Sequence, residues 1–182
     1  MSILYLIRHG RAAAAWDVDP DPGLDELGRE QARLAAESLL AHGPMDVVTS
    51  PMARARETAQ PFAQAWQLEP RVEARISEIP SPTTDLAARG AWLRELADQK
   101  WPSLDQSLWD WRQGALAALE EAQKDTVFLS HFMVINAVLA AVLGKERVVS
   151  FRPDYCSITV LCNDKGRLSL ISHGAEANTR VL

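Results

Sequence analysis

The sequence predicts an α/β fold, a three-layer α/β/α sandwich with a mostly parallel sheet. Short apolar segments at residues 3–7, 46–50 and 126–130 have the length and composition of buried strands. Stretches with helical spacing of apolar residues separate these segments, so strands and helices alternate along the chain. Near its end the chain carries two strand-like segments around a turn sequence, which is typical of an antiparallel hairpin.

In the first half, residues 25–42 show the period of an amphipathic helix, with Asp25 as the predicted N-cap and Gly43 just past its end. Residues 51–66 are predicted to form the next helix. Ser50 would cap it and Pro51 would occupy its first turn. Together with the flanking apolar segments these helices indicate strand-helix-strand units.

In the second half, Ser103 and Gln106 have the spacing of a capping box for a helix that runs to about residue 124. Residues 132–143 are apolar nearly all round, which predicts a buried helix ended by Gly144. Residues 157–172 contain the predicted hairpin, with its turn at Asn-Asp-Lys-Gly.

Between residues 79 and 104 the periodic pattern stops. This insertion contains several prolines, and Trp92 and Trp101 lie within it. One interpretation is a lid over the carboxyl edge of the sheet, where ligands bind in open α/β folds. The other is a small packing subdomain, and the sequence favours neither.

Length and composition predict one domain over residues 1–182, because 182 residues with 47% hydrophobic composition can form a full-sized core. The net charge is −5 with acidic and basic residues interleaved, so nucleic acid is not an expected partner. No apolar stretch approaches the roughly 20 residues of a membrane span, and no signal peptide is recognised, so we expect a soluble cytoplasmic protein without a membrane partner. Monomer and homodimer both remain open. Cys156 and Cys162 are expected to be reduced thiols.

Four short motifs place polar residues next to predicted strands or helices. The first strand ends in Arg8-His9-Gly10, which brings a guanidinium and an imidazole to the carboxyl edge of the sheet. SPMARARET at residues 50–58 follows the second strand, RISEIP carries Glu78, and FLSHFMVIN places His131 at the start of a helix, where free amides favour negative charge. The arrangement predicts an anion-binding pocket.

In this order and over most of the chain, these motifs resemble those of the histidine phosphatase (phosphoglycerate mutase-like) superfamily. The resemblance implies an α/β sandwich and phosphoryl transfer through a phosphohistidine. It implies His9 as nucleophile, Arg8 and Arg54 as the phosphate clamp, His131 as a second catalytic and phosphate-binding histidine, and Glu78 as proton donor. Arg54 is preferred over Arg56 because the arginine of the family lies four residues after the Ser of this motif.

The residue types suit this chemistry without the resemblance. Arginine donates two parallel hydrogen bonds to a phosphate dianion, and nearby guanidinium groups lower the pKa of an imidazole, which keeps it a neutral nucleophile. A carboxyl group in a partly buried site can hold a proton for the leaving oxygen. We consider Arg11 as a further substrate contact.

The other histidines have simpler interpretations. His42 lies at a predicted helix C-terminus, where it would interact with the helix dipole. His173 stands in a Ser-His-Gly sequence like that of the family, but it follows a hairpin strand and precedes a polar tail, so His131 is preferred. No pair of histidines has zinc-ligand spacing, and we expect neither a metal nor another cofactor.

Departures from the family pattern favour hydrolysis over mutase activity. Many members carry Thr and Asn where this chain has Ala12 and Ala15, and the Gly-rich segments of the glycolytic mutases are replaced by IPSPTTD and LDQS. A mutase must retain and reorient a phosphorylated intermediate, which needs such polar groups. The sequence therefore predicts a metal-independent phosphomonoesterase acting on a phosphorylated small molecule. A phosphomutase, a protein phosphohistidine phosphatase and a non-catalytic phospho-ligand binding module are the alternatives.

Overall fold

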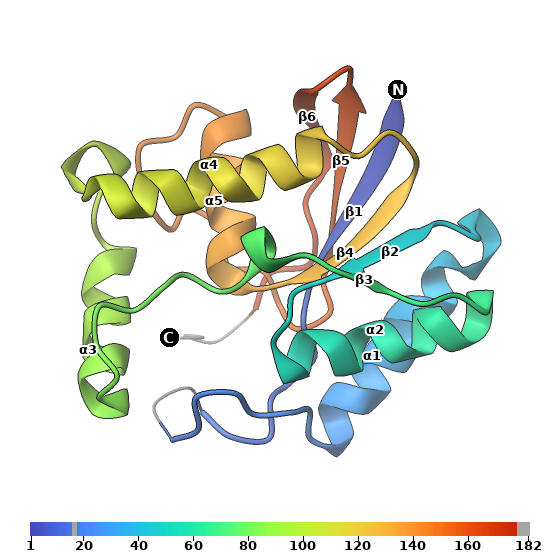
Figure 1. Ribbon diagram of the computed structural model, residues 1–182, viewed down its shortest axis with the longest axis horizontal. Coiled ribbons are helices and arrows are strands. Elements are labelled where there is room, and N and C mark those ends of the chain that lie inside the picture. Colours follow the sequence, from blue (N-terminus) through green and yellow to red (C-terminus); the bar gives the residue numbers. More distant parts are fainter. Residues whose placement is uncertain (16–17, 178–182) are drawn as a thin grey trace.

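The structure, a computed structural model, describes residues 1–15 and 18–177 and is built around a mixed six-stranded sheet in the order β3-β2-β4-β1-β5-β6 (Figure 1). The strands are β1 (Ser2–Arg8), β2 (Asp46–Thr49), β3 (Arg71–Val72), β4 (Thr126–Ser130), β5 (Ile158–Asp164) and β6 (Arg167–Ser172). Strands β1 to β4 are parallel, and β5 is antiparallel to both of its neighbours. The predicted α/β class and the C-terminal hairpin are confirmed.

Helices connect these strands in the predicted alternation. They are α1 (Glu26–Leu39), α2 (Ala53–Trp66), α3 (Leu86–Ala97), α4 (Gln106–Glu120) and α5 (Phe132–Val142), with short 3-10 helices η1 (Leu40–His42), η2 (Ala74–Ile76) and η3 (Trp101–Ser103). Helices α1 and α2 contact each other, as do α4 and α5.

The alternation of side chains along β1 explains why helices cover both faces of the sheet. Leu4 and Leu6 pack in one apolar cluster with residues of α4 and α5. Tyr5 and Ile7 contact a second cluster, formed with residues of α1 and α2. Because neighbouring side chains of a strand point to opposite faces, a nearly continuous apolar run produces two buried faces and three layers.

Two of the predicted helix ends are as expected and one is not. The Asp25 carboxylate accepts the Gly28 N–H at 2.7 Å and caps α1, and Gly144 follows α5 with a φ of +63°. Gly43 is not a left-handed C′ residue, because its φ is −99° and η1 separates it from α1. A side chain at Gly43 would overlap the Trp66 ring, so close packing explains the glycine.

Both predicted caps that involve serine are wrong. Helix α2 begins at Ala53 with Met52 as N-cap, and the Ser50 hydroxyl instead bonds His131. Helix α4 begins after Asp105 and ends at Glu120; Ser103 Oγ donates to the Lys100 carbonyl, outside the helix. In both cases a hydroxyl that could cap a helix has found a different partner.

Residues 79–104, predicted as an insertion, pack against α5. Leu93 and Leu96 of α3 join Trp101 in an apolar cluster that includes Phe132 of α5. This burial supports the packing interpretation. Residues of α3 also line the cavity described below. Movement of this segment as a lid remains a prediction.

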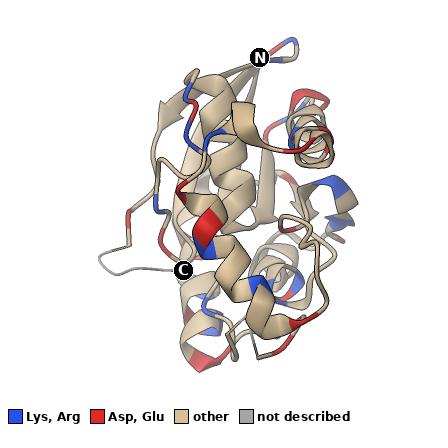
Figure 2. Cartoon of the chain, turned by 90° about the vertical axis from the view of Figure 1, so that its left-hand side faces the viewer, with Lys and Arg blue, Asp and Glu red and all other residues tan. Residues whose placement is uncertain are grey.

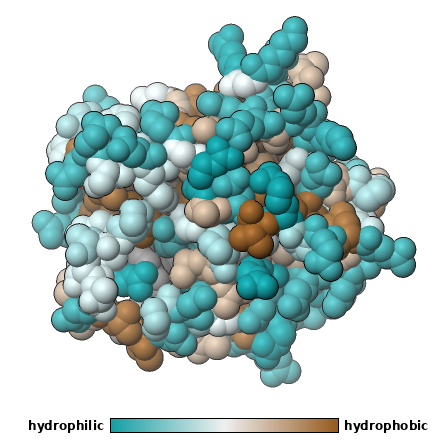
Figure 3. All heavy atoms as spheres, in the orientation of Figure 1, coloured by the Kyte–Doolittle hydropathy of each residue, from teal (hydrophilic) through white to brown (hydrophobic). Residues whose placement is uncertain are grey.

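The surface mixes charges and apolar groups. On the face in Figure 2, basic and acidic residues are interspersed, and on the face in Figure 3 hydrophobic residues form small scattered groups. Every helix within residues 1–15 and 18–177 is too short or too polar to cross a bilayer. Cys156 and Cys162 are both free thiols, as predicted. A cytoplasmic location stays a prediction.

Two helical glycines provide a matched test of the packing. A Cβ at Gly28 in α1 would overlap the Arg11 carbonyl oxygen, whereas a Cβ at Gly114 in α4 would meet nothing closer than Arg75 Cγ at 3.7 Å. We expect Gly28→Ala to lower the free energy of unfolding by about 1–3 kcal/mol, and Gly114→Ala to raise it by about 0.5–1 kcal/mol. Urea denaturation of both variants measures the difference. Equal effects would contradict the close approach of α1 to the Arg11 backbone.

Candidate active site

The carboxyl ends of β1 and β4 bring two histidines together. Arg8 ends β1 and pairs in register with Ser130, which ends β4, and His9 and His131 directly follow. The His9 backbone N–H donates to the Ser130 carbonyl at 2.9 Å. The imidazole rings of His9 and His131 consequently lie 5.3 Å apart between centroids, at an angle of 59°.

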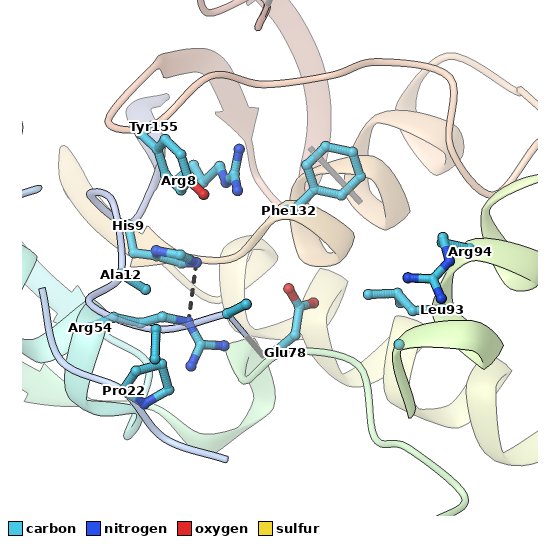
Figure 4. A pocket seen from close by; sticks show the side chains of 13 residues that line it. Arg8, His9, Ala12, Pro22, Arg54, Glu78, Leu93, Arg94, Phe132 and Tyr155 are labelled. Atoms are coloured by element: carbon cyan, nitrogen blue, oxygen red, sulfur yellow. Dashed lines mark hydrogen bonds between the residues drawn. The ribbon is translucent and has the colours of Figure 1, made fainter. Parts of the chain in front are cut away.

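A cavity of about 300 Å³ opens beside these residues (Figure 4). Its charged and ionisable lining comes from β1, α2, the segment after η2, α3 and the loop before β5. These lining residues are Arg8, His9, Arg54, Glu78, Arg94 and Tyr155. His131 is fully buried behind His9 and does not reach the wall.

His9 is held as one tautomer. Its Nδ1 lies 2.7 Å from the Gly10 carbonyl oxygen, which can only accept, so the ring hydrogen resides on Nδ1. The Arg54 Nε–H donates to His9 Nε2 at 3.1 Å, so Nε2 carries the lone pair (Figure 4). Burial, and then the charges of Arg54 and Arg8, hold the pKa of His9 well below its usual value. His9 is therefore a neutral imidazole whose basic nitrogen faces the guanidinium groups.

Three buried donors around His9 have no hydrogen-bond partner among the described residues. They are Arg8 Nε, Arg54 Nη1 and His131 Nδ1. Buried polar groups are normally satisfied, so each unsatisfied donor calls for an explanation. An anion with several acceptor oxygens, bound in the cavity that Arg8 and Arg54 line, is a ligand that would satisfy the two arginine donors.

The rest of the Arg8 guanidinium is firmly held. Its Nη1 donates to the Pro153 carbonyl at 3.0 Å, and its Cζ lies 3.9 Å from the centroid of the Tyr155 ring. Stacking on an aromatic face stabilises a desolvated cation. Arg54 has the Asp21 carboxylate 3.8 Å from its Nη1, beyond hydrogen-bond distance. Burial lowers the pKa of both guanidinium groups.

Ser50 orients the second histidine. Its Oγ lies 2.7 Å from His131 Nε2 and accepts the Met52 backbone N–H at 3.3 Å. A serine hydroxyl can donate to Nε2 or accept from it, and when it donates, the ring hydrogen of His131 lies on Nδ1. Burial and the charge of Arg54 lower the pKa of His131 well below its usual value, so this ring is neutral.

Glu78 lies across the cavity from His9 (Figure 4). Its Oε1 accepts the Ile79 backbone N–H at 2.9 Å. Burial raises the pKa of the Glu78 carboxyl, although this N–H and the charges of Arg54 and Arg8 act in the opposite direction. A carboxyl group with a raised pKa can act as a proton donor nearer neutral pH.

The cavity region thus contains five of the six residues singled out from the sequence. Arg11 is the exception: it is exposed, and its Nε bonds Asp25 Oδ2 at 2.5 Å, because the carboxylate that caps α1 also attracts this guanidinium. It is not among the described residues that line the cavity. Arg56, His42 and His173 are also exposed and outside the cavity.

Sequence analysis missed the residues that connect these groups. Thr58 Oγ1 accepts the Gly10 N–H at 3.0 Å and donates to the Arg54 carbonyl at 2.7 Å, which joins the β1 loop to α2. Its position four residues after Arg54, on the same helix face, was a usable signal. Ser50 was assigned to a helix cap. Tyr155 belongs to no motif, and nothing local indicates its stacking on Arg8.

Comparison with known proteins shows the family to which the chain belongs. Residues 4–176 match the family model of the Histidine phosphatase superfamily (branch 1). A glucosyl-3-phosphoglycerate phosphatase of Mycolicibacterium vanbaalenii is 28% identical over 166 residues, which cover 78% of this chain and 74% of the relative. Phosphoserine phosphatase 1 of Hydrogenobacter thermophilus is 30% identical over 196 residues, which cover 90% of this chain and 88% of the relative.

A solved mycobacterial glucosyl-3-phosphoglycerate phosphatase in complex with VO3 superposes with a TM-score of 0.75 at 25% identity, over 97% of this chain and all of the other. Fold, family match and the names of these relatives support assignment to the phosphoric monoester hydrolases. The chain belongs to the Histidine phosphatase superfamily, branch 1.

The lowered histidine pKa values make stability depend on pH. Below about pH 6.5 the unfolded chain binds protons that folded His9 and His131 do not. We therefore expect the free energy of unfolding to decrease as the pH is lowered, by up to about 1.4 kcal/mol per pH unit for each histidine. His9→Gln should remove one histidine's share of this slope between pH 6.5 and 5. Urea denaturation across this range compares the wild-type protein with His9→Gln. The raised pKa of Glu78 changes stability with pH in the opposite direction, and it does so equally in both proteins. An unchanged slope would show that folded His9 titrates normally.

Proposed function

We propose that the protein hydrolyses phosphate monoesters of small molecules through a covalent phosphohistidine on His9. One observation carries the proposal: neutral His9 lines a cavity together with Arg8 and Arg54, and one nitrogen of each arginine, Arg8 Nε and Arg54 Nη1, lacks a hydrogen-bond partner within the described residues. A phosphate dianion supplies both the charge and the acceptor oxygens that this arrangement lacks. The relatives named as phosphatases of glucosyl-3-phosphoglycerate and phosphoserine support a small phosphorylated substrate.

In the first step, Arg8 and Arg54 bind the phosphate oxygens from the cavity wall, while His131 packs against the His9 ring from behind. His9 Nε2 attacks phosphorus as the bond to the ester oxygen breaks, and the protonated Glu78 carboxyl transfers its proton to that oxygen. The Nδ1–H bond to the Gly10 carbonyl stays in place and stabilises the positive charge that develops on the ring. The alcohol then leaves.

In the second step, Glu78 is a carboxylate and acts as a base. It takes a proton from a water molecule whose oxygen attacks the phosphohistidine. The phosphorus–nitrogen bond breaks, its electron pair returns to Nε2, and inorganic phosphate is released. Glu78 is protonated again, so both groups are ready for the next turnover.

Hydrolysis of p-nitrophenyl phosphate in the presence of EDTA tests the proposal. We expect sustained release by the wild-type protein and none above background by His9→Ala, with the exposed His173→Ala variant as matched control. Alkaline quenching during turnover with the ³²P-labelled ester should retain label on the wild-type protein and the control, but not on His9→Ala.

Three results would contradict the proposal. Hydrolysis that survives His9→Ala would exclude His9 as nucleophile. Thermal stabilisation by phosphate without any turnover would indicate a binding module. Isomerised product exceeding free phosphate, with 3-phosphoglycerate as probe, would indicate a phosphomutase.

The role of Glu78 predicts a dependence on the leaving group. Glu78→Gln should slow hydrolysis of an alkyl phosphate about 10²- to 10⁴-fold, because an alkoxide needs a proton to leave. The same variant should slow the first step with p-nitrophenyl phosphate much less, since nitrophenolate is a stable anion at neutral pH. Burst-phase release of nitrophenol, compared with alkyl phosphate turnover, separates the two. Equal losses in both would contradict general acid catalysis by Glu78.

A further inference from the structure

One end of the cavity is polar and the rest of its wall is apolar. Arg8, His9, Arg54 and Glu78 form the polar end and have roles in the proposed reaction. Most of the other described residues that line the cavity are apolar: Ala12, Ala14, Ala15, Pro22, Leu93 and Phe132. The organic part of a substrate bound with its phosphate at His9 must therefore contact alkyl and aromatic groups.

These apolar residues come from separate parts of the fold. The alanines follow β1, Phe132 begins α5, and Leu93 belongs to α3. Phe132 and Leu93 are almost fully buried members of one cluster, so this wall is packed and preformed. A hydroxyl group held against such a wall loses hydrogen bonds to water and gains none from these side chains. An alkyl or aryl group in the same place gains from burial.

One charged residue outside the phosphate end also lines the cavity within the described chain. Arg94, in the last turn of α3, is exposed, and it lies with Leu93 across the cavity from His9 (Figure 4). An exposed guanidinium can bind an anionic group by two parallel hydrogen bonds with little desolvation. Apolar walls with cations at both ends match a ligand that carries an anion at each end.

We propose that the preferred substrates are compact phosphate monoesters in which an apolar chain or ring links the phosphate to a second anionic group, and that Arg94 binds this second group. The proposal rests on the proposed phosphatase function. A volume of about 300 Å³ is at the lower limit of small-molecule sites, which favours a compact molecule. Arg94 and the apolar wall would then determine which substrate binds, without taking part in the chemical step.

Three six-carbon esters with primary alcohol leaving groups test this proposal: hexyl phosphate, sorbitol 6-phosphate and 6-(phosphonooxy)hexanoate. We expect kcat/KM for hexyl phosphate to exceed that for sorbitol 6-phosphate about tenfold or more. The hexanoate should gain about a further fivefold over hexyl phosphate. Four- and eight-carbon homologues of the carboxylated ester are measured as well, because the length of the apolar spacer decides whether its carboxylate reaches Arg94.

Variants test whether Arg94 causes the preference for carboxylated esters over hexyl phosphate. Arg94→Gln should remove the advantage of the carboxylated esters through a higher KM, with kcat and hexyl phosphate hydrolysis nearly unchanged. Arg33→Gln, at an exposed arginine of α1, is the matched control and should retain the advantage.

The outcomes distinguish this inference from the proposed function. A kcat/KM for sorbitol 6-phosphate equal to or above that for hexyl phosphate would overturn the apolar substrate class while p-nitrophenyl phosphate is still hydrolysed. A carboxylate advantage that is absent at every chain length, or that survives Arg94→Gln, would overturn the role of Arg94. Failure to hydrolyse p-nitrophenyl phosphate would overturn the proposed function itself.

Discussion

The burial of two guanidinium groups beside a neutral imidazole is the constraint on which the site depends. Arg8 and Arg54 are each 4% exposed, and His9 is 6% exposed. Removing cations from water costs free energy unless partners replace the lost hydration. The Tyr155 ring and the Pro153 carbonyl replace part of it for Arg8, and the Asp21 carboxylate lies 3.8 Å from Arg54 Nη1. The same burial keeps His9 neutral.

The unsatisfied donors are stable because the surrounding structure is rigid. The Arg8 backbone is paired with Ser130 in the centre of the sheet, and Thr58 connects the Gly10 backbone to that of Arg54. The Arg8 side chain is also held by the Pro153 carbonyl and the Tyr155 ring, and the Arg54 side chain by its hydrogen bond to His9 Nε2. In the proposed function, a phosphate group that enters the cavity meets donors that are already placed, so little reorganisation is needed on binding.

The apolar part of the cavity has two effects that come from the same packing. Low polarity around Glu78 raises the pKa of its carboxyl, which suits a proton donor. The α3 segment that contributes Leu93 belongs to the apolar cluster with Trp101 and Phe132, so the residues that surround the alcohol part of a substrate are continuous with the core. The proposed specificity and the proposed acid catalysis would thus depend on one set of contacts between residues 79–104 and α5.

The sequence by itself determined the order of strands and helices, and it singled out most of the residues that the structure brings together at the candidate site. Apolar runs and helical periods are local properties, and Arg8, His9, Arg54 and His131 occur directly after strands or at helix starts, where topology alone brings them to one edge of the sheet. Glu78 was singled out in the RISEIP motif, but its segment has no clear period, so its assignment as proton donor depended on the resemblance to the family.

Only the tertiary structure decided which polar groups bond to which. Ser50 fits a helix cap locally, but its hydroxyl bonds His131, 81 residues away, and Arg11 bonds the carboxylate that caps α1. Tyr155 acquires its place only when the loop before β5 reaches Arg8. A hydrogen bond or ring contact forms with whichever group lies within a few ångströms after folding, and no local pattern of residues encodes that distance.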